Sequence, residues 1–257
     1  MARRPPGPFL NQRGLLLAGT LLSLVLAACG DEVPATSPRV CEETKKPEVH
    51  SLWQCGPTLD FTPINSYQGE FADVMDREDA VVLIDGRCTG TLIQARTGPV
   101  VVTAGHCVAL GDRSLLVFNF EDAPDGDPLV TEGTVIEQSF DPDYALITLD
   151  ALPAVTPVQL AIQASERLAI IQHPRGHPKV IAEGTFVDSC NQLVYYADLD
   201  TLVGSSGAGV LNRQGHLVGI HTDGDCDEKG RGTNRGWTSQ VIVEASAYLQ
   251  PEDLLEL

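Results

Sequence analysis

Between Ala80 and Ser239 the chain consists mainly of short apolar runs separated by glycine, proline and aspartate. Runs this short and this evenly spaced are typical of antiparallel strands in a β-barrel or a β-sandwich. Two prolines in residues 151–157 mark a connection, so the runs form two successive groups. We expect strands at Ala80–Ile84, Thr89–Gln94, Val100–Thr103, Leu115–Asn119, Thr131–Gln138 and Ala145–Leu149, and then at Leu168–Gln172, Lys179–Val187, Gln192–Tyr195, Gly209–Leu211, Leu217–His221 and Gly236–Ser239.

The end of the chain predicts one short helix. Residues Val241–Tyr248 have helical spacing, and Pro251 follows them as a stop signal. The sequence therefore predicts an all-β fold with a short C-terminal helix.

A serine flanked by glycines lies in residues 204–209, Gly-Ser-Ser-Gly-Ala-Gly. A tight turn there exposes the hydroxyl and leaves the N–H groups of Gly204 and Ser206 free to converge on one point. An acyl-transfer nucleophile needs such donors for its developing oxyanion. By itself the stretch is equally well a surface loop, and a serine without a base is inert.

A base and an acid stand at the ends of two apolar runs. Residues 101–107 run from valines into His106 and then Cys107, and Asp143 opens the run that continues to Leu149. Histidine, aspartate and serine thus follow one another in the order of one known triad arrangement. Asp143 is favoured over Asp141 and Asp150 because the apolar run begins directly after it.

Three segments resemble the motifs of chymotrypsin-like serine proteases: 103–107 (Thr-Ala-Gly-His-Cys), 143–146 (Asp-x-Ala-Leu) and 204–207 (Gly-x-Ser-Gly). The match spans about residues 80–248. It implies two antiparallel six-stranded β-barrels with the active site between them. It also implies a serine endopeptidase that acts on proteins or peptides as a monomer, without metal or organic cofactor. The implied site residues are His106, Asp143 and Ser206 as triad, with the Gly204 and Ser206 amides as oxyanion hole.

Two alternatives to this interpretation stay open. Ser205 competes with Ser206 as nucleophile, although Ser206 precedes the glycine of the family's Ser-Gly pattern. The protein is alternatively a catalytically silent, protease-like binding module of the cell envelope, because Ala208-Gly209 stands where the family usually has Gly-Pro. A complete triad argues against the binding module.

Two residues give opposite expectations for the substrate. Asp200 precedes Ser206 by six residues, where a trypsin-like pocket has its lysine- or arginine-binding carboxylate, but it is also interpreted as a turn-capping residue. His221 resembles the pocket histidine of glutamyl endopeptidases, which helps to hold a substrate carboxylate. We favour cleavage after glutamate or aspartate over cleavage after lysine or arginine, and cleavage after small apolar residues is a further alternative. Ser205 stands where trypsin-like enzymes have the aspartate that pairs with a new N-terminus, so maturation of that type is not expected.

The first residues have the features of a secretory signal. Arg3, Arg4 and Arg13 precede an apolar run, Leu15–Ala28, that is short for a membrane span. Leu-Ala-Ala before Cys29 resembles a bacterial lipobox; an ordinary signal peptide is the alternative. We expect an exported cell envelope lipoprotein, with a signal peptide at 1–28, a tether at 29–70 and the protease domain at 71–257.

Six cysteines remain after Cys29, an even number that favours disulfides in an exported protein. Zinc binding is disfavoured because no Cys-x-x-Cys spacing occurs, and the acidic run 223–228 is interpreted as a solvated loop rather than a calcium site. The family resemblance implies a bridge between Cys88 and Cys107. The other expected pairs are Cys190–Cys226 and Cys41–Cys55.

The net charge excludes some partners. The chain carries −18 at pH 7, and loss of residues 1–28 removes three arginines and no acid, which leaves −21. Such a charge disfavours nucleic acid and anionic lipid surfaces. A lipid anchor is then the only expected contact with the membrane.

Overall fold

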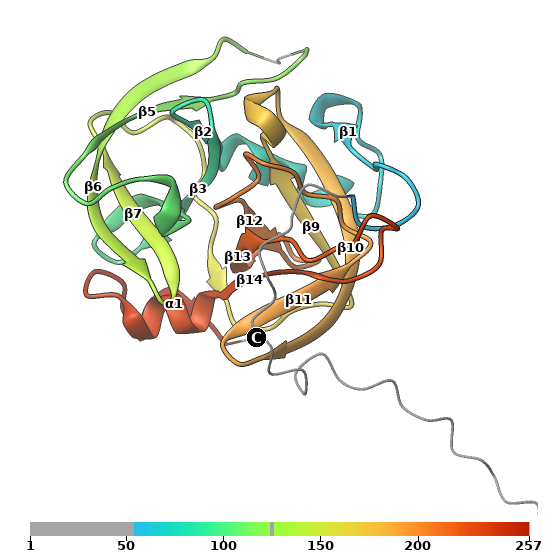
Figure 1. The fold of residues 1–257 in the computed structure, drawn as a ribbon. Helices are drawn as coiled ribbons and strands as arrows, with labels where there is room; N and C mark the ends of the chain where they lie inside the picture. Colours follow the sequence, from blue (N-terminus) through green and yellow to red (C-terminus); the bar gives the residue numbers. More distant parts are fainter. Residues whose placement is uncertain (1–53, 124–125, 257) are drawn as a thin grey trace, which may run out of the picture. The chain divides into compact units, whose positions relative to one another are not determined.

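Two closed antiparallel β-barrels of six strands each form the part of the chain that the computed structural model describes, residues 54–123 and 126–256 (Figure 1). All of these residues belong to the second of the chain's two units, 38–257. The first barrel has the order β2-β3-β4-β7-β6-β5. Its strands are β2 (Val81–Ile84), β3 (Cys88–Ala95), β4 (Gly98–Thr103), β5 (Arg113–Phe118), β6 (Leu129–Phe140) and β7 (Asp143–Leu149).

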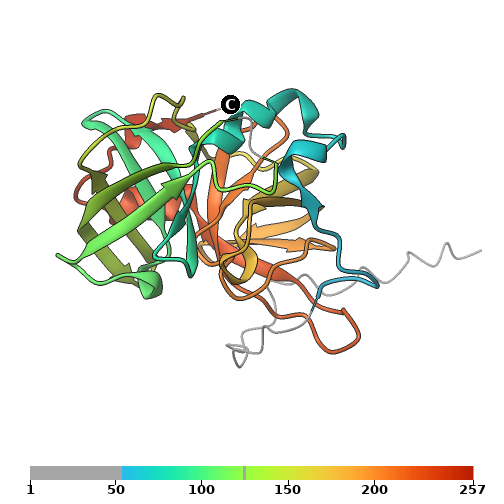
Figure 2. The ribbon, with the colours of Figure 1, turned by 90° about the horizontal axis from the view of Figure 1, so that it is seen from above.

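The second barrel closes through the pairing of β12 with β13, in the order β12-β9-β10-β11-β14-β13. Figure 2 shows it beside the first barrel, in yellow and orange next to green. Its strands are β9 (Arg167–Gln172), β10 (Val180–Cys190), β11 (Leu193–Ala197), β12 (Gly209–Leu211), β13 (Leu217–Asp223) and β14 (Asn234–Thr238). Three short strands lie at its margin: β1 (Thr62–Pro63), β8 (Leu160–Ala161) and β15 (Leu254–Leu255).

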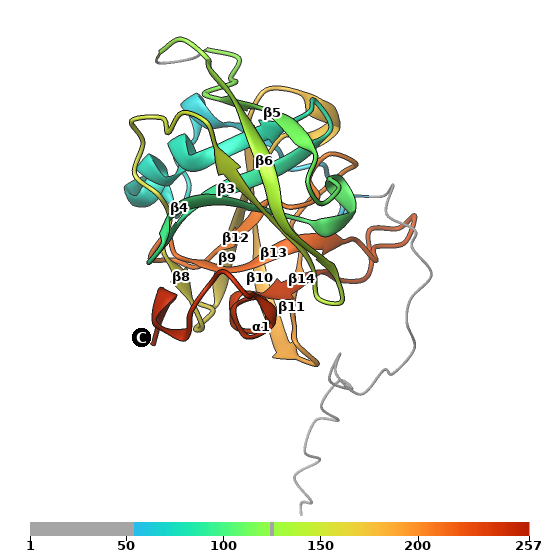
Figure 3. The same cartoon turned by 90° about the vertical axis from the view of Figure 1, so that its left-hand side faces the viewer.

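Each expected strand overlaps an observed one, which confirms the all-β fold and its two six-stranded barrels. The helix α1 (Ser239–Ala245) begins two residues before the expected start, and it packs against β13 and β14 (Figure 3). Thr238 explains the earlier start. Its hydroxyl accepts the N–H of Val241, so β14 passes directly into a capped helix.

A buried apolar cluster continues from one barrel into the other. It contains Val101 and Leu146 of the first barrel, Ile171 and Ile220 of the second, and Ile242 of α1. Burying these apolar side chains stabilises the fold, and separating the two barrels would expose them to water. The barrels therefore form a shared core, and their loops meet at a fixed seam.

An ionic cluster is buried beside this core. Lys179, which precedes β10, donates from Nζ to the Glu78 carboxylate and, at 2.9 Å, to Glu121 Oε1. Glu121 follows β5, and its other oxygen accepts from Asn65 Nδ2 at 2.7 Å. Burial raises the pKa of Glu78 to about 7, with Lys179 opposing the shift. The cluster joins the two barrels to the segment that precedes them.

The disulfides differ in part from the expected pairs. Cys88 is joined to Cys107, the pair that the resemblance implies. Cys55 is joined to Cys226 with 5.4 Å between their Cα atoms, so the predicted pairs Cys190–Cys226 and Cys41–Cys55 are wrong. Cys190 is itself disulfide-bonded.

The physical reason is the course of the N-terminal extension. From Gln54 onward it lies on the second barrel: Gly56 N–H donates to Gly230 O at 2.8 Å, and β1 pairs with β10. The predicted pairs joined cysteines that follow one another in the sequence, and this rule does not allow for an extension that lies across the second barrel. The last part of the expected tether therefore contacts the protease barrels. The signal peptide, Cys29 and Cys41 lie outside the described residues.

Candidate active site

His106 and Asp143 are hydrogen-bonded to each other at one end of the first barrel. His106 lies on a 3₁₀ turn (Gly105–Cys107) after β4, and Asp143 is the first residue of β7. Asp143 Oδ1 accepts the His106 N–H at 2.9 Å, and Oδ2 lies 2.6 Å from Nδ1. Gly105 permits this approach, since a Cβ there would lie 2.0 Å from Ser139 O.

The charge of Asp143 tunes the imidazole. Its hydrogen bond raises the pKa of His106 above 6.5, burial acts in the opposite direction, and the charges of Asp143 and Asp223 add to the rise. The ring stays accessible, with 43% of its side chain exposed. An imidazole that is held through Nδ1 has its Nε2 free to act as a base.

Ser206 lies on the loop between β11 and β12, beside the residues that lead into His106. Its carbonyl accepts the Thr89 N–H of β3 at 3.0 Å and lies 3.8 Å from Cys107 Sγ. The next residue, Gly207, is so close to β4 that a Cβ would lie 2.1 Å from Thr103 Oγ1. The structure thus brings this loop of the second barrel against the strand end that carries His106.

The two adjacent serines have different surroundings. Ser205 is fully buried, and its Oγ accepts the Leu202 N–H at 3.0 Å within the loop. Ser206 is partly exposed. The hydroxyl of Ser205 is therefore occupied by the loop itself, which favours Ser206 as the residue that meets a substrate.

Two backbone N–H groups, those of Gly204 and Ser206, have no acceptor among the described residues. Gly204 has φ +98°, and a Cβ there would lie 2.7 Å from both Arg175 N and His173 O, so glycine is required. Between them, the Ser205 N–H donates to Leu202 O. Free, fixed N–H groups can bind an oxyanion.

Comparisons with known proteins concern the family and the fold of this chain. Residues 88–220 match the model of the trypsin-like peptidase domain, a stretch that covers half of the chain. The chain belongs to this family. The crystal structure of a serine endoprotease from Yersinia pestis is similar in fold, with a TM-score of 0.56 and 14% sequence identity over 69% of this chain. This chain covers 65% of the length of that structure. No curated protein sequence gives a significant match.

His221 of β13 is buried, as a member of a polar group in this trypsin-like domain. Its Nδ1 lies 2.6 Å from the Tyr196 hydroxyl of β11. Burial and the nearby His106 lower the pKa of His221 to about 3, with the backbone of Arg235 opposing them. His221 is therefore neutral at physiological pH and can contribute a hydrogen bond but no charge.

Asp223 and Arg235 lie next to His221, and sequence reasoning missed both as site residues. They are cross-strand partners on β13 and β14, with 3.8 Å between Asp223 Oδ2 and Arg235 Nε. Only 15% of the Arg235 side chain is exposed. A charge pair of this kind depends on strand register, which no local motif indicates.

The carboxylate of Asp200 is buried and is bound by the N-terminal extension. Its Oδ1 accepts the Cys55 N–H at 2.8 Å, its Oδ2 accepts the Asp60 N–H at 2.5 Å, and the residue is fully buried. Both oxygens are thus occupied by backbone donors. This arrangement differs from the substrate-binding role that the sequence suggested for Asp200.

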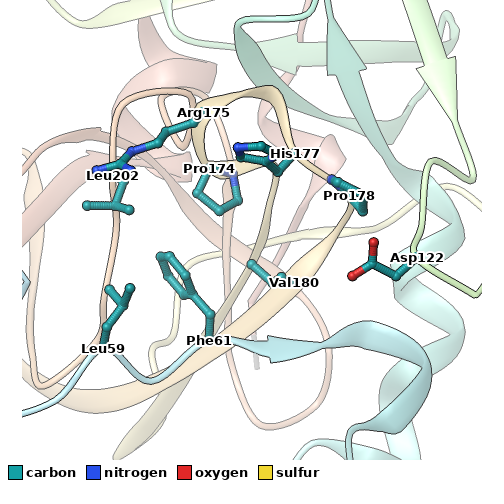
Figure 4. A pocket seen from close by; sticks show the side chains of 9 residues that line it. All are labelled: Leu59, Phe61, Asp122, Pro174, Arg175, His177, Pro178, Val180 and Leu202. Carbon is teal, nitrogen blue, oxygen red and sulfur yellow. The ribbon is translucent and has the colours of Figure 1, made fainter.

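A pocket of about 340 Å³ is lined mainly by residues of the second barrel and of the extension that precedes the barrels (Figure 4). Its side chains come from the N-terminal extension, from the β9–β10 connection and the start of β10, from the serine loop and, through Asp122, from the β5–β6 connection of the first barrel. The lining residues are Leu59, Phe61, Asp122, Pro174, Arg175, His177, Pro178, Val180 and Leu202. None of the expected site residues lines it.

The described residues contain no group of three or more histidine, cysteine or acidic side chains that could hold a metal ion. In the acidic run, Asp227 accepts hydrogen bonds from Arg231 and from the Lys229 N–H, which lower its pKa to about 2. This carboxylate therefore stabilises its own turn. Over the same described residues, no helix has the length and hydropathy that a membrane crossing needs.

Proposed function

We propose that this protein is a serine endopeptidase that cleaves proteins or peptides through an acyl-enzyme. The observation that carries the proposal is the His106–Asp143 hydrogen bond beside a loop with a partly exposed Ser206 and two free N–H groups. His106 Nε2 takes the proton of the Ser206 hydroxyl as its oxygen attacks the scissile carbonyl. The N–H groups of Gly204 and Ser206 stabilise the oxyanion.

Asp143 has two tasks in this mechanism. Its carboxylate accepts the Nδ1 proton, which keeps the tautomer that leaves Nε2 as the base, and it stabilises the imidazolium that forms. The imidazolium then protonates the leaving amine. Water then attacks the acyl-enzyme while His106 takes its proton; His106 returns this proton to Ser206 Oγ as the bond to the acyl group breaks and the carboxylic acid leaves.

Labelling by a fluorophosphonate tests the proposal. The oxidised protein should form an adduct that mass spectrometry locates on Ser206, and Ser206→Ala should form none. An adduct on Ser205 would contradict the assignment of the nucleophile. Absence of any adduct in folded protein with intact disulfides would favour the binding module.

For specificity we propose cleavage after glutamate, as in glutamyl endopeptidases. His221 can donate to a substrate carboxylate. The charges of Asp223 and Arg235 both act on the Tyr196 hydroxyl that contacts it, and Arg235 partly offsets the negative charge of Asp223 there. The engagement of Asp200 by backbone N–H groups removes an opposing carboxylate. Digestion of a peptide library should give cuts after glutamate that His221→Ala weakens. Dominant cuts after arginine or lysine would contradict this proposal.

We further propose an exported lipoprotein with signal peptide 1–28, extension 29–70 and protease domain 71–257. Its disulfides are consistent with an oxidising compartment. Cys29 would carry the acyl chains. Cell fractionation should find the wild type with membranes and Cys29→Ala released; equal membrane association of both would overturn the lipid anchor.

A further inference from the structure

The N-terminal extension crosses the second barrel as a strap, residues Cys55–Phe61, behind the loop that carries Ser206. The strap is tied at both ends. Cys55 is bonded to Cys226 at its start, and β1 pairs with β10 directly after its end. In between, Gly56 N–H donates to Gly230 O at 2.8 Å. The strap is therefore part of the second barrel rather than free chain.

Asp200 connects the strap to the serine loop, residues 199–206. Its buried carboxylate accepts N–H groups from Cys55 and Asp60, which are supplied by the strap alone. No cation is within ion-pair distance of this carboxylate among the described residues, so the two strap amides are its only compensation. A buried charge without hydrogen bonds is strongly unfavourable. Loss of the strap would therefore force Asp200 to move toward water.

Movement of Asp200 would reach the oxyanion donors because the loop is short and is fixed around this residue. The Asp200 carbonyl accepts from Gln172 Nε2 at 2.8 Å, and the neighbouring Leu199 carbonyl accepts from Asn234 Nδ2 at 2.7 Å. Four residues after Asp200, the backbone reaches Gly204. The position of that amide thus depends on how the start of the loop is held.

Other contacts also hold the loop, because Thr89 Oγ1 donates to Gly204 O at 2.8 Å and Arg175 N–H donates to Val203 O at 2.5 Å, but neither supplies a donor to the Asp200 carboxylate. Ser205, directly before the candidate nucleophile, is bonded only to residues close by in the chain: its N–H donates to Leu202 O at 2.9 Å, its Oγ accepts the Leu202 N–H, and its carbonyl accepts the Ala208 N–H at 3.0 Å. Leu202 also lines a pocket together with Leu59 and Phe61 of the strap (Figure 4). The strap thus contacts the serine loop both through Asp200 and along this pocket wall.

We propose that Asp200 is a positioning residue for the oxyanion hole, and that the strap, clamped by Asp200 and by the Cys55–Cys226 disulfide, holds the serine loop in its active conformation. This inference rests on the proposed peptidase function. The strap would do internally what a newly cut N-terminus does elsewhere: it would supply buried backbone donors that order the loop.

Asp200→Asn tests the clamp with little change of volume. An amide can accept one of the two strap N–H groups, but its NH₂ group faces the other donor. Asp198→Asn is the matched control, since Asp198 is exposed and two residues away. We expect Asp200→Asn to lower kcat roughly tenfold to a hundredfold with KM within about threefold, because an oxyanion donor acts on the transition state. Asp198→Asn should match the wild type.

The split between kcat and KM separates positioning from other roles. A specificity carboxylate would change KM and the residue preference, whereas a general loss of folding would lower the active fraction, which fluorophosphonate titration measures, without changing kcat per active site. The pKa that governs kcat/KM should stay the same, because the clamp does not contact His106. An unchanged kcat per active site in Asp200→Asn would overturn the proposal.

A second variant removes the strap's anchor and leaves Asp200 intact. Cys55→Ser/Cys226→Ser should also lower kcat. This double variant provides the test if Asp200→Asn does not fold. Amide hydrogen exchange over residues 199–206 measures how well the loop is ordered and does not require catalytic activity. We expect exchange at least tenfold faster in both variants than in Asp198→Asn. If the wild type never reacts, the peptidase function fails while this exchange test still decides the clamp.

Discussion

The two halves of the candidate site are held together in different ways. In the first barrel His106 and Asp143 contact each other directly, and a disulfide spanning 19 residues pins the histidine turn. In the second barrel the serine loop depends on partners far away in the chain. The Cys55–Cys226 disulfide spans 171 residues and the Cys55–Asp200 hydrogen bond spans 145. The candidate base is therefore held by contacts within its own barrel, whereas the loop of the candidate nucleophile is held by contacts from distant parts of the chain.

The largest expected effect is a loss of kcat when the His106–Asp143 hydrogen bond is changed. Asp143→Asn should lower kcat by about 10⁴-fold, because the amide favours the wrong imidazole tautomer. Steady-state kinetics with a peptide substrate measures this. Asp141→Asn is the matched control: Asp141 is exposed and two residues away, and it should keep wild-type activity. Equal losses in both variants would contradict the assignment of Asp143.

Lys179→Met should break the ionic cluster that joins the two barrels. It leaves the carboxylates of Glu78 and Glu121 buried without their cation, which costs about 3–5 kcal/mol of unfolding free energy. Denaturant unfolding measures the loss. Lys229→Met, on an exposed turn, should stay within about 0.5 kcal/mol of the wild type. A small effect of Lys179→Met would mean that the cluster does not hold the barrels together.

Two threonines on β3 test the contact between the first barrel and the serine loop. Thr89 Oγ1 donates to Gly204 O at 2.8 Å and accepts His173 N–H at 3.0 Å, so Thr89→Val should cost about 1–3 kcal/mol and also lower kcat. Thr91 is equally buried, but its Oγ1 has no hydrogen-bond partner among the described residues. Thr91→Val should therefore be nearly neutral or stabilising. The reverse order in thermal or denaturant unfolding would contradict this.

The smallest expected effect is a shift in pH dependence. His106 acts as a base only when neutral, so kcat/KM should rise with pH through a pKa above 6.5. Asp223→Asn should move this limb to lower pH by a fraction of a unit, since Asp223 adds to the raised pKa.

The free energy of unfolding should change with pH in the opposite direction to kcat/KM. A raised histidine pKa favours the folded state at low pH, so this contribution is present below pH 6.5 and is lost as pH rises through the folded pKa. Unfolding at pH 6 and pH 9, in wild type and His106→Ala, checks the sign. If kcat/KM instead rose through a pKa below 6.5, the raised pKa of His106 would be contradicted.

Much of the fold could be predicted from the sequence because strands and turns are local. Alternation in residues 113–118 determines which side chains enter the barrel, as the buried Leu116 and exposed Leu115 illustrate. The candidate triad could be proposed from the sequence for a similar reason. Each member stands in a short motif with the backbone that its task requires, such as the glycine before His106 and the glycines around Ser206.

The sequence by itself determined the elements of this protein, whereas only the tertiary structure decided which distant residues meet. Cys55 pairs with Cys226 rather than with a nearby cysteine because the extension crosses the second barrel. For the same reason Asp200 meets strap amides instead of an open pocket, and Lys179 is neutralised by carboxylates from outside its barrel. Local patterns arise from backbone geometry and alternating burial. Long-range partners depend on how completed elements pack, and one-dimensional spacing does not contain that information.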